Sequence, residues 1–171
     1  MDLNQMRDQV FGVMEEKGFH GIEHTQLEAI TFRQIGHLMT EWGEARRLYL
    51  KLPARYNGGH TATVAEMNEE LADIIIVALD LAGIHGLDMG DVGIEKTPIG
   101  TIDGMWEEIA VKIGQLNDIY RKTNEINAGV LRRIIVLAAF IMRRCGGEPM
   151  TEVETKMAIN TERKEKYGVA A

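Results

Sequence analysis

The sequence predicts an all-α protein, and three observations carry that prediction. Apolar residues recur three and four positions apart along most of the chain, whereas runs that alternate apolar and polar residues are absent. The three prolines, Pro53, Pro98 and Pro149, each fall where this periodic pattern breaks. Apolar residues make up 45% of the 171 residues, which is typical of a globular chain. We therefore expect a single helical domain over residues 1–171 with its own buried core.

Six helices are predicted from this periodicity. They cover residues 2–17, 25–52, 63–85, 103–125, 128–145 and 151–168. The second has the clearest apolar stripe, which steps by three and four from Ile35 to Leu52. Thr151, with Glu154 three residues later, predicts a capping box that begins the last helix, after Pro149 has ended the fifth. The two longest connections are residues 53–61 and 87–101.

The second and third predicted helices resemble the fourth and fifth. The segment Ile35-Gly36-His37-Leu38 recurs as Ile113-Gly114-Gln115-Leu116, and residues 71–78 recur in similar form as residues 131–138. This pattern indicates a duplicated helix pair, although buried helices also resemble one another through composition alone. The repeat halves would be residues 25–89 and 103–150, followed by the C-terminal helix over 151–168.

Charge and composition exclude several classes of partner. The formal net charge is −7, whereas a protein that follows a nucleic-acid backbone is usually basic, so we expect no nucleic-acid partner. The longest apolar run, residues 134–142, is far shorter than a membrane span, so we expect no membrane partner. The chain has one cysteine and no secretory signal at its start, which predicts a reducing, cytoplasmic location.

Two pairs of acidic residues are the strongest candidates for a functional site. Glu41 and Glu44 lie three apart on the second predicted helix, so they share one face beside its apolar stripe. Glu70 and Asp73 have the same spacing on the third helix, which is apolar on nearly all sides and so is expected to be buried. A buried carboxylate is unfavourable unless it is paired or holds a metal ion.

A metal site follows if the two helices pack antiparallel. The four carboxylates would then converge, and they would repel one another strongly without a cation. Oxygen ligands of this kind suit Mg²⁺, with Mn²⁺ as a substitute. The alternative for a single Glu-x-x-Glu pair is an ordinary solvated helix face.

The last predicted helix offers a complementary set of side chains. Lys156, Asn160 and Arg163 step by four and three along one face. Cations and an amide on one face can hold phosphate oxygens. The alternative is an ordinary charged helix, because glutamates are interspersed with these residues.

These motifs together resemble a known family. Glu41-x-x-Glu44, 25 intervening residues and Glu70-x-x-Asp73, followed later by Lys156-x-x-x-Asn160-x-x-Arg163, resemble the MazG-like branch of the all-α nucleotide pyrophosphohydrolases. The resemblance covers most of residues 15–89 and again residues 153–168.

The resemblance implies a fold, a reaction and a set of roles. It implies a helical bundle that hydrolyses a nucleoside triphosphate, NTP or dNTP, to a monophosphate and pyrophosphate. Mg²⁺ would be bound by the four acidic residues of the two pairs, and Glu41 would position or deprotonate the attacking water. The basic motif, Lys156, Asn160 and Arg163, would hold the phosphates. Members generally associate, so a homodimer or higher homo-oligomer is expected.

The chain departs from the family pattern in two places. Many relatives have a further glutamate where this sequence has Thr40, and their basic motif often follows the third helix rather than the fifth. In the second repeat half, the positions of the four acids are taken by Ile119, Lys122, Val130 and Arg133. That half would be a degenerate copy packed against the first, with basic residues facing the phosphates.

Two other interpretations remain open. The chain could be a catalytically silent nucleotide-binding or interaction module on the same bundle. Phosphoribosyl-ATP pyrophosphatases share the implied fold, although the segments matched here look more MazG-like. Turnover in the presence of Mg²⁺ separates an enzyme from a silent module.

Overall fold

The computed structural model describes residues 2–18, 26–53, 55, 61–91 and 100–166. Within them the chain forms six α-helices and no β-strand, which confirms the predicted fold class. The helices are α1 (Leu3–Glu16), α2 (Leu27–Leu50), α3 (Val64–Ile84), α4 (Ile102–Thr123), α5 (Ala128–Arg144) and α6 (Pro149–Lys166). Predicted loop residues 56–60 and 92–99 lie outside the described residues.

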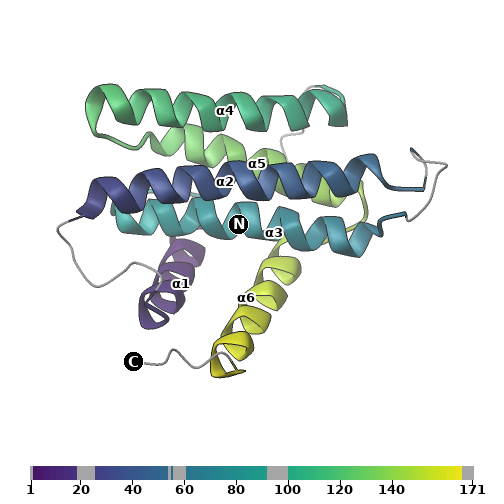
Figure 1. The fold of residues 1–171 in the computed structure, drawn as a ribbon, viewed down its shortest axis with the longest axis horizontal. Helices are drawn as coiled ribbons and strands as arrows, with labels where there is room; N and C mark the ends of the chain where they lie inside the picture. The colour runs from purple at the N-terminus through teal and green to yellow at the C-terminus, as the bar shows by residue number, and fades with distance from the viewer. Residues whose placement is uncertain (1, 19–25, 54, 56–60, 92–99, 167–171) are drawn as a thin grey trace.

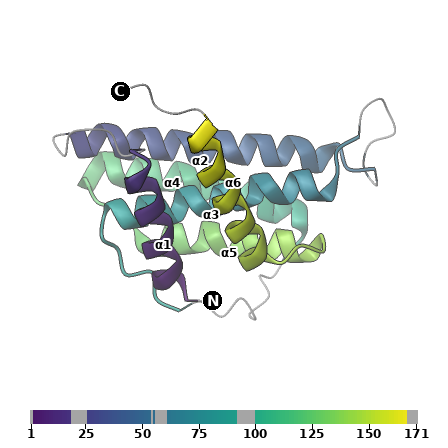
Figure 2. The same cartoon turned by 90° about the horizontal axis from the view of Figure 1, so that it is seen from below.

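Four of the helices form a bundle. Helix α2 packs against α3 and α4, while α5 packs against α3 and α4. Helices α1 and α6 both lie on α3, on the side away from α4 and α5 (Figures 1 and 2). Helix α3 therefore lies at the centre of the molecule, between the α4–α5 pair and the α1–α6 pair.

This central position explains the composition of α3. Every residue from Ile74 to Ala82 is buried, and all but Asp80 are apolar. Full burial of a single Ile or Leu side chain contributes about 1.5–3 kcal/mol, so such a helix is stable only where partners surround it. The helix begins with a capping box that the sequence analysis missed, in which the Thr63 side chain accepts from Glu66 N (3.1 Å) and Glu66 Oε2 accepts from Thr63 N (2.7 Å).

The start of α6 corrects the sequence analysis. The helix begins at Pro149 rather than at a capping box formed by Thr151 and Glu154. Proline has φ fixed near the helical value and lacks an N–H that would go unused in the first turn, so it favours the first position of a helix. The backbone N–H of Glu152 already donates to the Glu148 carbonyl (3.0 Å). Pro149 thus starts α6, whereas α5 ends at Arg144, just before Gly146 with its φ of +91°.

None of the helices that the structure describes is both long enough and apolar enough to cross a bilayer.

Candidate metal centre

Two polar contacts between α2 and α3 show the relative direction of these helices. Thr31 Oγ1 lies 2.8 Å from His85 Nε2, and Gln34 Nε2 donates to the buried carboxylate of Asp80 (2.5 Å). Because numbers rise along α2 as they fall along α3, the two helices are antiparallel. Asp80 therefore serves as an inter-helix hydrogen-bond acceptor.

Further along the interface between α2 and α3, three of the predicted ligands come together. Glu41, Glu44 and Glu70 each place one carboxylate oxygen so that the three oxygens lie within 4.8 Å of one another. Glu41 is buried, Glu70 is half-buried and Glu44 is exposed, so the cluster opens from the helix interface towards solvent. This is the one such cluster found among the described residues.

The fourth predicted ligand, Asp73, has a different partner. Its Oδ2 lies 2.7 Å from Lys156 Nζ, which also donates to Glu69 Oε1 at 2.7 Å. Lys156 is only 6% exposed, so its charge depends on these two carboxylates. The predicted phosphate-binding lysine and the predicted metal ligand are thus joined in an ion pair between α6 and α3.

Burial and mutual repulsion shape the ionisation of the cluster. Burial, reinforced by the charge of Asp73, raises the pKa of Glu70 to about 7. Burial likewise raises the pKa of Asp73 to about 6, although Lys156 opposes that shift. Burial also acts against the charge on Lys156, but its hydrogen bonds to Asp73 and Glu69 prevail and raise its pKa. Burial, together with the nearby acids, therefore disfavours the ionised forms of Glu70 and Asp73, and Lys156 offsets part of this effect at Asp73.

His37 fixes the position of Glu41. It lies one turn earlier on α2, and its Nε2 is 2.7 Å from Glu41 Oε1. This hydrogen bond raises the pKa of His37 against the opposing effect of burial. The sequence placed His37 one turn before Glu41, and the structure shows that the two side chains are in contact.

The rest of the basic motif lies on α6 beyond Lys156. Asn160 is one turn further on and half-buried, and Arg163 belongs to α6, with its side chain outside the described residues. Near this end of α6, Lys17 Nζ donates to Thr161 Oγ1 (3.1 Å), which links the end of α1 to α6.

Sequence reasoning missed Glu69. It holds Lys156 together with Asp73, and its position four residues before Asp73 puts both on one face of α3. That spacing could have predicted that the two carboxylates together bind one lysine side chain.

The second helix pair does not supply cations to the cluster. Arg133 makes a bidentate pair with Glu108 of α4, through Nε to Oε1 (2.7 Å) and Nη2 to Oε2 (2.9 Å). Lys122 pairs with Asp118, one turn away on α4 (2.8 Å). Both basic side chains therefore form ion pairs with acidic residues of α4 and do not point to the acidic cluster. The duplication itself stays a prediction.

No family model, no curated protein and no solved structure matches this chain. The features of this chain that bear on function are therefore the acidic cluster and the lysine beside it.

Proposed function

We propose that this protein is a Mg²⁺-dependent nucleoside triphosphate pyrophosphohydrolase. The observation that carries the proposal is the convergence of Glu41, Glu44 and Glu70, from two helices, to within 4.8 Å, beside the Asp73–Lys156 ion pair. The acids could bind a metal ion, and the buried ammonium group of Lys156 beside them could bind phosphate oxygens. This combination fits a substrate that is a complex of a metal ion and a phosphate group.

The donor set fits a hard divalent cation. All three clustered groups offer carboxylate oxygens, the ligands that Mg²⁺ and Mn²⁺ prefer. Burial and the charge of Asp73 raise the pKa of Glu70, so a bound cation would favour its ionised form. When bound, such an ion would neutralise phosphate charge and lower the pKa of a bound water.

The chain's own residues supply the remaining functions. Glu41, held through Oε1 by His37, is placed to position or deprotonate a water molecule. The water oxygen attacks phosphorus, the phosphoanhydride bond breaks, and pyrophosphate leaves a nucleoside monophosphate behind. Lys156, Asn160 and Arg163 hold the phosphate tail through charge-assisted hydrogen bonds. Lys156 would exchange part of its contact with Asp73 for phosphate oxygens.

A silent nucleotide-binding module is the second candidate, and one observation favours it. Lys156 already satisfies Asp73, so three acids rather than four form the cluster. Such a module would bind nucleotide without releasing product.

The proposal includes a homodimer and a cytoplasmic location. Large apolar side chains stay exposed on several helices, among them Met39 (40%), Leu50 (48%) and Val111 (56%), and a partner would cover some of them. Light scattering at micromolar concentration should give twice the chain mass, and a monomeric mass would exclude the dimer. The location rests on the single cysteine.

Product analysis tests the reaction. The purified protein is incubated with each common NTP and dNTP plus Mg²⁺, and the phosphorus products are followed by ³¹P NMR. We expect monophosphate and pyrophosphate from at least one substrate. Orthophosphate as the first product would contradict this bond cleavage, and binding without turnover would favour the silent module.

A further inference from the structure

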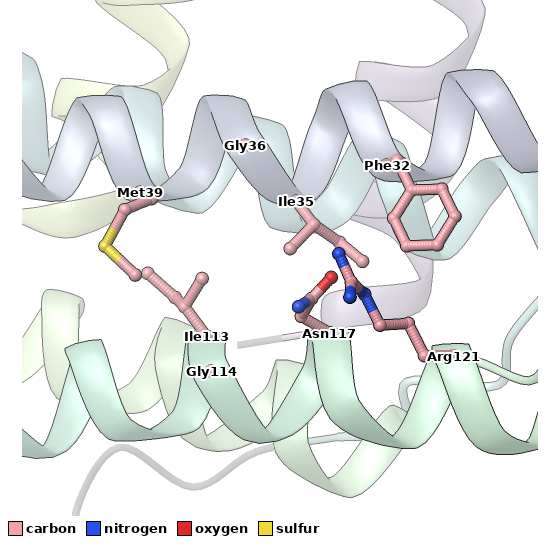
Figure 3. Close-up of a pocket in the computed structure, with 8 residues that line it drawn as sticks. All are labelled: Phe32, Ile35, Gly36, Met39, Ile113, Gly114, Asn117 and Arg121. Atoms are coloured by element: carbon pink, nitrogen blue, oxygen red, sulfur yellow. The ribbon is translucent and has the colours of Figure 1, made fainter.

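Helices α2 and α4 leave an open groove between them, on the far side of α2 from the acidic cluster. It has a volume of about 400 Å³. Its lining residues are Phe32, Ile35, Gly36, Met39, Ile113, Gly114, Asn117 and Arg121 (Figure 3). At 100° per residue, the α2 side chains of the groove lie roughly 160° around the helix from Glu41 and Glu44. The groove is therefore separate from the proposed catalytic site.

Two glycines in the middle of helices keep the groove open. A Cβ atom built on Gly36 or on Gly114 would meet nothing within 4 Å. Glycine inside a helix costs about 1 kcal/mol relative to alanine, so some gain elsewhere is expected to offset it. Among the residues that the structure describes, no close packing against either glycine provides that gain. Instead, the two glycines leave an open space between the flanking side chains of Phe32 and Met39 (Figure 3).

One end of the groove is polar, and its two polar side chains come from α4. Asn117 and Arg121 lie one turn apart on α4, and both side chains project into the groove (Figure 3). In the part of the chain that the structure describes, neither makes a hydrogen bond or an ion pair. The Arg121 guanidinium carbon lies 5.7 Å from the centre of the Phe32 ring. The nearby Asp118 pairs with Lys122, which lowers the pKa of Asp118, and the charge of Arg121 adds to this effect.

We infer that this groove binds a small organic anion with a flat aromatic body. The body lies over the glycine floor between Phe32 and Met39, and the anionic group meets the donors of Asn117 and Arg121. A guanidinium presents N–H groups in a planar fork that matches a carboxylate or a phosphate. The groove volume falls within the range of about 300–1,000 Å³ common for small-molecule sites.

The charged group could come from an aryl carboxylate or from a nucleotide phosphate, and two probes distinguish these sources. 2-Naphthoate and AMP are each titrated into the full-length protein by calorimetry, without Mg²⁺ and with EDTA present. The Glu70→Ala variant is titrated in parallel. Because Glu70 lies at the other site, binding in the groove should be unchanged in this variant whether or not the proposed catalysis exists.

Matched variants locate the binding. Arg121→Ala should weaken binding of the preferred probe by about tenfold or more. Lys112→Ala removes the same charge elsewhere on α4, where Lys112 donates to Gln115, and should leave affinity unchanged. Gly114→Leu fills the floor of the groove and should abolish binding, while Tm is unchanged or higher because the site has room and leucine favours helix.

The outcomes are distinct. Tighter binding of AMP identifies a nucleotide-type ligand, and tighter binding of 2-naphthoate identifies an aryl acid. The inference is overturned if neither probe binds at millimolar concentration, or if binding survives both Arg121→Ala and Gly114→Leu.

Discussion

The ammonium group of Lys156 lies 2.7 Å from the Asp73 carboxylate, so a residue of α6 satisfies the acid that would complete the four-acid set. Glu69 holds the same ammonium group at 2.7 Å. Lys156 therefore docks α6 on α3, and in the proposed function the same side chain also couples metal binding to phosphate binding.

Replacing Lys156 tests this coupling. Lys156→Met leaves Asp73 and Glu69 facing each other without a cation, so Tm should fall in the absence of Mg²⁺ and recover in part when Mg²⁺ is added. If Lys156 also holds phosphate, kcat/KM should fall by about ten- to a hundredfold. Lys112→Met, which removes an equal charge on α4, serves as the control. Full activity in Lys156→Met would remove this lysine from the site.

Substitutions of Glu70 and of Arg163 should affect Mg²⁺ binding and turnover differently. Glu70→Gln keeps the side-chain size but removes a charged ligand, so both Mg²⁺ binding and turnover should be lost. Arg163→Ala should retain Mg²⁺ binding while kcat/KM falls by about ten- to a hundredfold, because one charge-assisted hydrogen bond is removed. Calorimetry with Mg²⁺ and steady-state kinetics separate the two. If Arg163→Ala keeps full activity, the C-terminal part of the basic motif is only a charged surface.

The affinity for Mg²⁺ should rise with pH. A carboxylate must lose its proton to bind a cation, and the pKa of Glu70 is raised to about 7. From about pH 6 to about pH 8 the ionised fraction of such a group rises about tenfold, and affinity should follow. Glu70→Gln should flatten this dependence. An affinity that is constant over this interval would contradict the role of Glu70.

The same shift predicts how stability depends on pH without metal. The folded-state pKa of Glu70 lies above its ordinary value of 4.5, so the folded protein holds this proton more tightly than the unfolded chain does. Its contribution therefore lowers the free energy of unfolding as pH rises from about 4.5 to about 7. Urea unfolding of the wild type and of Glu70→Gln, compared across this interval, isolates the contribution of Glu70.

Two glycine substitutions should change stability in opposite directions. A Cβ on Gly83 would lie 2.6 Å from side-chain atoms of Phe11, where α1 crosses α3, so Gly83→Ala should lower the free energy of unfolding by about 1–3 kcal/mol. Gly43→Ala on α2 meets nothing within 4 Å and should raise it by up to about 1 kcal/mol. Chemical unfolding measures both. Equal effects would mean that α1 does not pack on α3 as described.

The helices were predictable because their signals are local. Apolar spacing and glycine positions placed all six within about two residues, apart from end residues that the structure does not describe. The start of α6 was missed because Pro149 was interpreted only as a helix terminator, although proline also favours the first position of a helix.

The site was predictable only in part. Spacing of three within each helix, with antiparallel packing, was enough to expect Glu41, Glu44 and Glu70 together. The pairing of Asp73 with Lys156 depends on where α6 docks on α3, and that is set by tertiary packing between helices far apart in the sequence. The groove between α2 and α4 likewise depends on the distance between two helices, which periodicity does not specify.

The central place of α3 has a consequence for the candidate ligands that it carries. Its buried residues 74–82 are surrounded by other helices, so their amide protons should exchange with solvent only through global unfolding. Glu70 and Asp73 extend from the first half of this same helix. The conformational entropy of the backbone that carries these side chains is already lost when the chain folds. Binding of an ion therefore does not have to order that backbone.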